Sequence, residues 1–513
     1  MSGAFSTLDW AIVSSYLILL LSIGWFFSRI KLRTAKDYFL GSNNMAPWVV
    51  AISVIATTQS AATFLGGPDQ GYRGDYTYLA TNIAAVIGSI FVARMLIPRF
   101  YAHKSTTVYE LLNQRYSIRA MRAAGLMYII GRFFASGSRL YLAAIAVSMI
   151  LFSNIDAHNI IISSLILVIL GFSVTFLGGI RSIIWTDLLQ FVMYVLSAAG
   201  VLYFLLNTIP LTIPEIMFAL AETPEGQNKL LLLDFNFDLS KPYSLISILT
   251  GMTLLYIASF GLDQDITQRL LTCKKGSDGG KALIVSAIIG IPIIWLFISV
   301  GQALYLFYER PDLMIGETIN SEFKGEKITI FMHYILNELP SGLKGLVTVG
   351  VIAAAVSTIN SGLNSMSSVL VQDFYRPWTE GYSTKSEIHY VRAGQIGMGL
   401  VGFILFVMSV ICFYWQRYSG LPLIDFALSV MVFAYSGLLG VYFTVIFTNR
   451  GSTTSVILAL IAGFITTLLQ QSYIVELLGL SVSWTNIAFT WQLCLGTAVS
   501  FFVCIAGKKL RII

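Results

Sequence analysis

Long apolar stretches separated by short polar segments cover almost the whole chain of 513 residues. A helix needs about 20 mostly apolar residues to cross a bilayer. The pattern predicts thirteen such helices, near residues 9–28, 46–66, 76–97, 121–151, 158–178, 184–206, 245–265, 283–308, 343–370, 393–414, 422–447, 452–472 and 486–507. Charged residues make up only 11% of the chain, against about a quarter in a soluble domain. The sequence therefore predicts an all-α polytopic membrane protein.

Basic residues are distributed unevenly between the two sides that alternating helices define. Of the Lys and Arg residues in connecting segments, 21 lie on the side of residues 29–45, Arg269 among them, and 8 lie on the opposite side. Because cytoplasmic loops carry the excess of Lys and Arg, we expect the N-terminus outside and the C-terminus in the cytoplasm. The net charge of +6 is explained by these loops and the anionic lipid they meet, so it does not indicate nucleic acid.

Several common site patterns are missing from the sequence. The four cysteines form no CxxC pair and the four histidines show no metal-ligand spacing, so neither a disulfide framework nor a zinc site is expected. No P-loop or GxGxxG occurs, so direct use of ATP has no visible site. The longest polar stretches, 207–244 and 309–342, fall on the outer side, and Pro214 and Glu215 favour a short helix in the first.

Two of the apolar runs are interrupted by polar residues and glycine at matching positions. Residues 51–68 read AISVIATTQSAATFLGGP, and residues 259–269 read SFGLDQDITQR. Five predicted helices separate the starting points of the two runs, as in transporters built from two inverted repeats whose first helices are broken near the membrane midplane. Each interruption alone is explained equally well by a helix end or a Ser/Thr kink. Their matching positions favour the repeat.

Hydroxyl and amide side chains crowd one face of the apolar run 351–370. Ala354, Ser357, Thr358 and Ser361 recur at spacings of three and four, so they share a helix face. Together with carbonyls freed by a broken helix, such hydroxyls supply neutral oxygens to a dehydrated cation such as Na+. The alternative is tight helix packing, which small polar residues also favour.

Ionisable residues inside predicted helices are further candidates for function. Asp187 follows a Gly-Gly turn in TFLGGIRSIIWTDLLQ, residues 175–190, where an Asp near a helix start could instead serve as a cap. Arg132 and Arg139 lie seven residues apart on one face of the run 121–151. A buried arginine favours an organic anion as its partner. Either arginine could instead snorkel or pair with a structural carboxylate or carbonyl.

Four motifs, AAAVSTINSGLNS, GGIRSIIWTD, IATTQSAATFLG and LDQDITQR, together resemble the bacterial sodium:solute symporter family, in the expected order over nearly the whole chain. The resemblance implies alternating access driven by sodium in a bacterial inner membrane. It also implies a LeuT-like core of two inverted five-helix repeats. The corresponding segments are an extra N-terminal helix and loop at 1–45, the repeats at 46–206 and 245–447, an extracellular loop at 207–244, and two C-terminal helices at 448–513.

The resemblance also implies which residues hold ions. The shared sodium site would use the backbone carbonyls of Ala56, Gln59 and Ala354 and the hydroxyls of Ser357 and Thr358. In the sialic acid branch of the family a second sodium is held at positions that correspond here to Asp187, Ser357, Asn360 and Ser361. Asn360 departs from the serine expected at its position and offers an amide oxygen instead.

The substrate site of the family lies beside the broken helix. At the matching positions Thr58, Ser60 and Thr63 offer hydroxyls, Tyr78 and Asn82 of the next helix add a ring and an amide, and Gln264 could contribute. The substrate arginine of the sialic acid branch lies where this chain has Ala135, one helical turn from Arg139.

We therefore expect no enzyme but a sodium symporter of a small organic anion, such as sialic acid or another sugar acid or carboxylate. A neutral sugar or an amino acid is the alternative substrate. A channel is less favoured, and so is a membrane-embedded enzyme built on Asp263 and Asp265, because that pair at a helix end suits a gate or an ion-pair network better.

Overall fold

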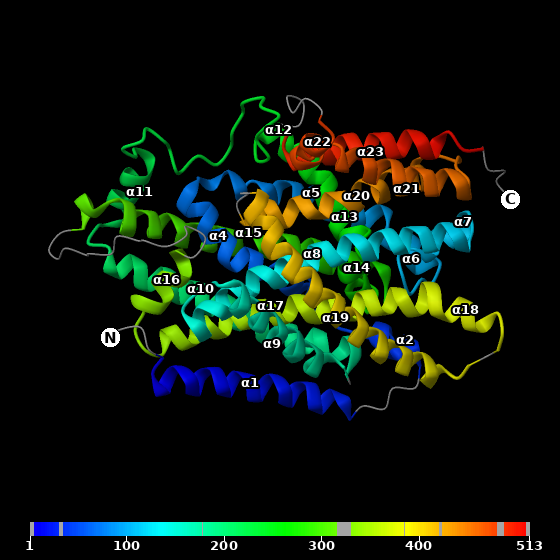
Figure 1. The fold of residues 1–513 in the computed structure, drawn as a ribbon, viewed down its shortest axis with the longest axis horizontal. Coiled ribbons are helices and arrows are strands. Elements are labelled where there is room, and N and C mark those ends of the chain that lie inside the picture. Colours follow the sequence, from blue (N-terminus) through cyan, green and yellow to red (C-terminus); the bar gives the residue numbers. More distant parts are fainter. Residues whose placement is uncertain are drawn as a thin grey trace.

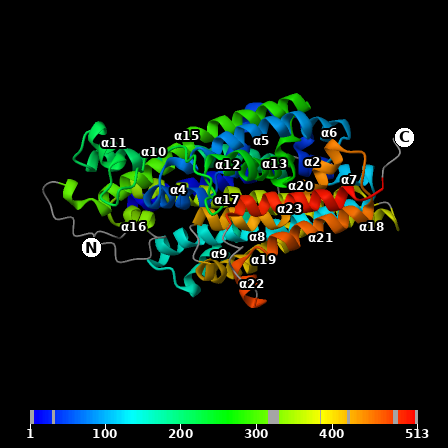
Figure 2. The same cartoon turned by 90° about the horizontal axis from the view of Figure 1, so that it is seen from above.

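The computed structural model describes residues 5–29, 34–176, 178–314, 330–383, 385–419, 423–479 and 487–508. Its helices run side by side along one long axis (Figures 1 and 2), and the described residues contain no β-strand. Nine of the described helices are long and apolar enough to cross a membrane, two further spans are bent helix pairs, and two shorter apolar helices lie near the C-terminus. Each of the thirteen predicted helices thus has a counterpart, which confirms the all-α membrane architecture.

The long helices differ from the predicted ranges mainly at their ends. In the first half they are α1 (Thr7–Ser28), α5 (Thr81–Met95), α8 (Ile118–Phe152), α9 (Ala157–Thr175) and α10 (Gly179–Thr208). In the second half they are α15 (Gly276–Glu309), α17 (Leu343–Val369), α19 (Glu387–Ser419), α20 (Leu423–Phe447), α21 (Thr453–Leu468) and α23 (Phe489–Ile505). Short helices connect them, namely α2 (Ala35–Leu40), η2 (Tyr76–Tyr78), α6 (Ile97–Ala102), α7 (Glu110–Arg115), α11 (Ile213–Ala221), α16 (Ile330–Asn337), η6 (Leu370–Tyr375), α18 (Arg376–Glu380) and α22 (Ser472–Leu477).

The two punctuated runs are broken helices, as the sequence predicted. α3 (Pro47–Thr58) and α4 (Ala61–Arg73) meet at 61°, because Gln59 has extended backbone angles and the Ser60 hydroxyl caps α4 by accepting from the Ala62 N–H. The segment Leu245–Gly261, which contains α12 (Leu245–Ser247), η3 (Ile248–Met252) and α13 (Thr253–Gly261), meets α14 (Gln264–Leu270) at 58°. Here Asp263 is the cap and accepts from the Asp265 N–H at 3.0 Å.

Helix α17, which carries the Ser357 stripe, lies at the centre of the bundle. It packs against α10, α8, α9, α1 and α19. In the most apolar 18-residue stretch of the span Leu343–Glu380, 89% of the residues are buried. Close approach is possible because its residues are small, and Gly350 lies against Ser197 of α10 and Phe64 of α4. The polar face of α17 is therefore turned toward the two broken helices instead of lipid.

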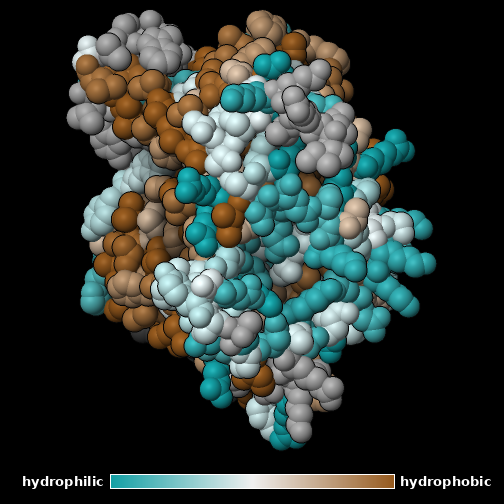
Figure 3. Space-filling view, turned by 90° about the vertical axis from the view of Figure 1, so that its right-hand side faces the viewer, coloured by the Kyte–Doolittle hydropathy of each residue, from teal (hydrophilic) through white to brown (hydrophobic). Residues whose placement is uncertain are grey.

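The two ends of the helix bundle carry different short helices. α1 begins at the end where α11 and α16 lie, and α23 ends at the opposite end, beside α7 (Figures 1 and 2). Hydrophilic side chains cover much of the end at which α6, α7 and α18 lie (Figure 3), the end that we expect in the cytoplasm. At the other end, Thr212 and Glu215 form a capping box that starts α11, which confirms the short helix predicted near Pro214.

Candidate functional site

The break between α3 and α4 leaves main-chain oxygen atoms in the middle of the bundle. Because α3 ends at Thr58, the carbonyl of Ala56 lacks its helical partner. It accepts a hydrogen bond from Ser357 Oγ of α17 at 3.2 Å. A cavity of about 10 Å³ lies here, about the size of one water molecule. Four of the five residues predicted for the shared sodium site line this cavity, namely Ala56, Gln59, Ala354 and Ser357.

This cavity suits a small dehydrated cation. Gln190 of α10 also lines it, and the buried Gln59 Oε1 has no hydrogen-bond partner among the described residues. Unpaired buried acceptors are costly, so a cation that they could bind would relieve that cost, and the residues present fit Na+. The fifth predicted residue, Thr358, does not line the cavity, since its hydroxyl donates to the Ala354 carbonyl at 3.0 Å.

Asp187 lies inside a helix and not at its start. α10 begins at Gly179, so the alternative that Asp187 caps the helix is wrong. The carboxylate is fully buried. Its Oδ1 accepts from Ser357 Oγ at 2.8 Å, and its Oδ2 accepts from Ser53 Oγ of α3 at 2.5 Å. Asp187 therefore connects α10 to both α3 and α17 beside this small cavity.

Arg269 is a residue of this site that the sequence analysis missed. It was counted with the cytoplasmic loops, but α14 turns it inward and its side chain is 1% exposed. Its Nη2 lies 3.1 Å from Asp187 Oδ2 and 2.5 Å from Ser361 Oγ. Asn360, predicted to face the same volume, is turned toward α9, where its amide can donate to the Gly171 carbonyl at 2.8 Å.

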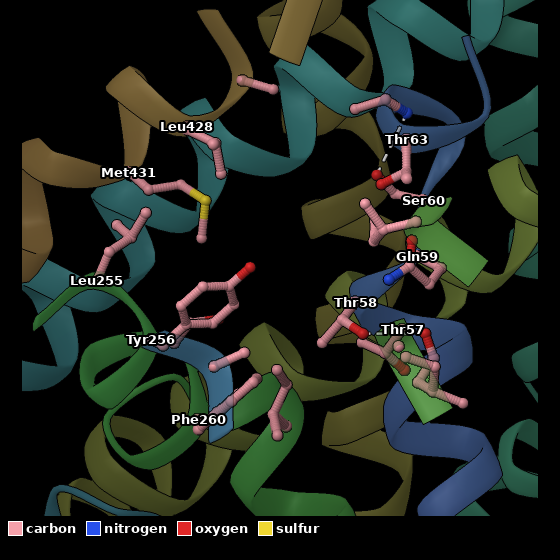
Figure 4. A pocket seen from close by; sticks show the side chains of 18 of the residues that line it. Thr57, Thr58, Gln59, Ser60, Thr63, Leu255, Tyr256, Phe260, Leu428 and Met431 are labelled. Carbon is pink, nitrogen blue, oxygen red and sulfur yellow. Dashed lines mark hydrogen bonds between the residues drawn. The ribbon is translucent and has the colours of Figure 1, made fainter. Parts of the chain in front are cut away.

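A larger pocket, of about 100 Å³, lies on the other side of the first break. Polar groups of Thr58, Gln59, Ser60 and Thr63 form one wall, and the apolar side chains of α13 and α20, such as Phe260 and Met431, form the opposite wall (Figure 4). The Tyr256 hydroxyl points into the gap (Figure 4). Of the predicted substrate residues, seven line this pocket, namely Thr58, Ser60, Thr63, Tyr78, Asn82, Arg132 and Arg139.

The two arginines of α8 have different surroundings. Arg132 is buried and its Nη1 lies 2.9 Å from Asp263 Oδ2, while its Nη2 pairs with Asp265. Arg139 is half-buried, and its only recorded polar contact is from Nη2 to Met431 Sδ at 3.6 Å. Among the described residues, Arg139 therefore presents a guanidinium to the pocket without a carboxylate partner.

Gln264 is not among the residues that line the pocket. Its Nε2 donates to the Thr106 carbonyl at 2.9 Å, and its Oε1 accepts from the Val108 N–H at 3.0 Å. Both ends of the amide are thus used to hold α14 against the segment before α7. This position does not support a substrate contact by Gln264.

Comparison with known proteins agrees with this geometry. The model of the sodium:solute symporter family matches residues 38–463. The sodium/sialic acid symporter NanT of Aliivibrio fischeri is 29% identical over 477 residues, which cover 91% of this chain and 88% of the relative. The sodium/sialic acid symporter SiaT of Proteus mirabilis is 27% identical over 471 residues, covering 90% and 89%.

A solved structure of a substrate-bound, outward-open Na+-coupled sialic acid symporter has the same fold, with a TM-score of 0.83 at 22% identity over 99% of this chain and 100% of that one. The inverted-repeat core expected from the two broken helices is thereby confirmed. The match over most of the chain and the two broken helices lead to one conclusion: this multi-pass membrane protein is a sodium-coupled transporter, not an enzyme, and belongs to the sodium:solute symporter family.

Proposed function

We propose that this symporter imports a small organic anion, with a sugar acid such as sialic acid as the best candidate, together with sodium. The observation that carries the proposal is Arg139, a cation that faces the pocket without a carboxylate partner among the described residues. A guanidinium in such a place favours a carboxylate, which it can bind with two parallel hydrogen bonds. Two relatives named sodium/sialic acid symporters support the same class.

The two walls of the pocket suit a sugar acid. Hydroxyls of Thr58, Ser60 and Thr63 can pair with the hydroxyl groups of a sugar, while the opposite apolar wall can cover its carbon face. Arg139 lies on α8, a different helix from the hydroxyls, so a bound molecule must carry its carboxylate and its hydroxyl groups on different edges. A simple monocarboxylate would pair with Arg139 but make no contact with the hydroxyls of Thr58, Ser60 and Thr63.

Sodium at the first break would connect this pocket to the rest of the bundle. We assign the ion to the carbonyls of Ala56, Gln59 and Ala354 and to the Ser357 hydroxyl, with Thr358 beside them. Binding there would fix α3 and α4 against α17 and so order Thr58 and Ser60 for the substrate. Movement of the repeats 46–206 and 245–447 against each other would then expose the site to each side, with the C-terminus in the cytoplasm of a bacterial cell.

Thermal stability of the purified protein tests this proposal. We expect sialic acid to raise the midpoint of unfolding in sodium and not in potassium, because a ligand stabilises the state that binds it. Arg139→Gln removes a hydrogen bond to a charged group, worth about 1.5–3 kcal/mol, and should weaken sialic acid binding by roughly 10- to 100-fold. The response to sodium alone should stay unchanged.

Arg310→Gln is the matched control, because Arg310 pairs with Asp312 outside the pocket and its loss should leave sialic acid binding unaffected. Stabilisation by a neutral sugar or an amino acid, with no response to any carboxylate, would overturn the assignment of an organic anion. It would leave the sodium site standing if sodium itself still stabilises the protein.

A further inference from the structure

We propose that Arg269 permanently fills the position at which a second sodium would bind, so that the protein carries one sodium per cycle. This inference rests on the proposed sodium coupling and refines its stoichiometry. The positively charged atoms of Arg269 lie among the oxygens predicted for that second ion. Nη2 contacts Asp187 Oδ2 at 3.1 Å and Ser361 Oγ at 2.5 Å.

The side-chain oxygens predicted to bind the second sodium already take part in hydrogen bonds within the protein. Asp187 Oδ1 accepts from Ser357, and Oδ2 accepts from both Ser53 and Arg269. The Ser361 hydroxyl donates to the Ser357 carbonyl at 2.7 Å while it accepts from Arg269. None of the side-chain oxygens of Asp187, Ser357 and Ser361 is a buried atom without a partner. The first break differs, since the buried Gln59 Oε1 has no hydrogen-bond partner there among the described residues.

The other member of the predicted set is turned away. The Asn360 amide can donate to the Gly171 carbonyl at 2.8 Å and to Thr175 Oγ1 at 3.1 Å, both on α9. It therefore offers its polar atoms to the helix behind α17 and not to Asp187. Asn360, which stands where the family resemblance leads us to expect a serine, is therefore also the predicted ligand that does not face Asp187.

Charge favours the same conclusion. A guanidinium about 3 Å from Asp187 neutralises the carboxylate that would attract a second ion, and it would repel a sodium at ion-pair distance. Arg269 is fixed from its other side, because its Nη1 donates to the main-chain oxygen of Asp265 at 2.8 Å and pairs with Asp265 Oδ1 at 3.2 Å. The two other carboxylates of this cluster, Asp263 and Asp265, both pair with Arg132 of α8.

One sodium per cycle has a consequence for energy coupling. Import of a singly charged anion with one sodium moves no net charge, so the membrane potential does no work on the cycle. A tenfold sodium gradient then supports about tenfold accumulation of the anion. A second sodium would add about 2.3 kcal/mol per 100 mV and about 1.4 kcal/mol for the gradient.

Equilibrium binding of radioactive sodium to the purified full-length protein, without any organic solute, tests the inference. We expect one ion bound per protein. Two ions would overturn the inference and leave the sodium coupling intact. No bound ion would overturn both the sodium site and the stoichiometry, so the two failures are distinguishable.

Two serines one turn apart on α17 provide the matched variants. Ser357→Ala should abolish measurable sodium binding or weaken it at least tenfold, while Ser361→Ala should leave affinity and stoichiometry unchanged. A loss of one ion in Ser361→Ala would contradict the inference. Arg269→Met should raise the count to two, because it frees the oxygens around Asp187. If that variant does not fold, the charge-neutral pair Asp187→Asn with Arg269→Gln should still bind one ion, and a fall to zero would place the measured ion at Asp187.

Discussion

The two broken helices have nearly the same bend, 61° between α3 and α4 and 58° between α13 and α14, but opposite chemistry. The first break is built from Gln59 and Ser60, without a charged side chain, and leaves a buried oxygen atom unpaired among the described residues. The second break holds Asp263, Asp265 and Arg269, all buried and all in ion pairs. The first break is therefore uncharged and contains a polar atom without a partner in the described part of the chain, whereas the second break is charged and its charges are paired.

The same helix-break geometry can therefore form a ligand site at one position and attach a helix to its neighbours at another. Backbone groups exposed by a helix break inside a membrane need partners from the protein or from a ligand. At the second break the carbonyls of Phe260 and Leu262 accept from the hydroxyls of Thr267 and Tyr109, and ion pairs with Arg132 and Asp187 hold α14 to α8 and α10. At the first break the Ala56 carbonyl accepts from Ser357, but the buried Gln59 Oε1 has no partner among the described residues, and a bound ion can supply one. Substitutions at the second break should therefore affect stability, and those at the first break should affect affinity.

The largest effect is expected from Arg132→Met at the second break. Removing this arginine leaves Asp263 and Asp265 buried with too little positive charge, and loss of one partner of a buried pair costs about 3–5 kcal/mol. We expect a marked loss of monodisperse protein after detergent extraction, measured by fluorescence-detected size-exclusion chromatography, and a lower midpoint of thermal unfolding.

Arg139→Met, seven residues along the same helix, is the control for Arg132→Met and should leave extraction and thermal stability nearly unchanged. Neutralising both acids as well, with Asp263→Asn and Asp265→Asn in the Arg132→Met background, should restore much of the stability. If Arg132→Met and Arg139→Met were equally stable, the second break would not hold the bundle through charge.

A smaller effect, on affinity alone, is expected from Ser357→Ala at the first break. The hydroxyl is a proposed ligand of the ion, and a hydrogen bond or ligand to a charged group is worth about 1.5–3 kcal/mol. The sodium concentration for half-maximal thermal stabilisation should rise by roughly 10- to 100-fold.

Ser367→Ala is the control on the same helix, because Ser367 donates to the Gly394 carbonyl of α19 and faces away from the break. It should respond to sodium as the wild type does. An unchanged sodium response in Ser357→Ala would remove Ser357 from the site.

The sequence predicted the first break better than the second. Hydropathy and the polar residues and glycines that interrupt an apolar run are local signals. The bend at Gln59 and the polar face of the run 351–370 could therefore be predicted from them. The pairing of Arg132 with Asp263 could not, because it depends on which residues of α14 face α8 in space. Arg269 ends a polar run that looks like a loop, and only the inward turn of α14 shows that its charge is buried. Arg132 and Arg139 looked equivalent for the same reason.

A third prediction concerns a single side chain whose removal should have opposite effects on the stability of the sodium-free protein and on its stabilisation by sodium. Gln59 lines the small cavity beside Ser357, and its buried Oε1 has no hydrogen-bond partner among the described residues. Gln59→Leu removes an unpaired acceptor whose burial costs about 1–3 kcal/mol, so the sodium-free protein should unfold at a higher temperature. Sodium should then stabilise the variant less than it stabilises the wild type. A variant that is less stable without sodium would show that the Gln59 side chain stabilises the packing of the break and does not belong to an ion site.

The smallest effect concerns the C-terminal end of α4 in the first broken helix. Lys229, in the segment after α11, donates to the carbonyls of Tyr72 and Gly74 at the end of α4, both at 2.9 Å. Its Nζ also lies 4.2 Å from the ring centre of Tyr305. Unlike the arginines of the second break, it has carbonyl and ring partners and no carboxylate within ion-pair distance in the described part of the chain. Burial lowers the pKa of Lys229 to about 8, from about 10.4 in a free side chain.

A lowered lysine pKa means that the docked segment binds fewer protons than the undocked one between pH 8 and about 10.4, so docking becomes more favourable as the pH rises through this range. Below pH 7 both forms are mostly protonated and the contribution is constant. We expect the difference in thermal midpoint between the wild type and Lys229→Met to increase by a few degrees or less from pH 7.5 to pH 9.5, with the variant correcting for every other titrating group. A difference that falls over this range would show that the ammonium is stabilised where it docks. In that case charge would also hold the first broken helix at the C-terminal end of α4, and the contrast between the two breaks would be confined to the middle of the membrane.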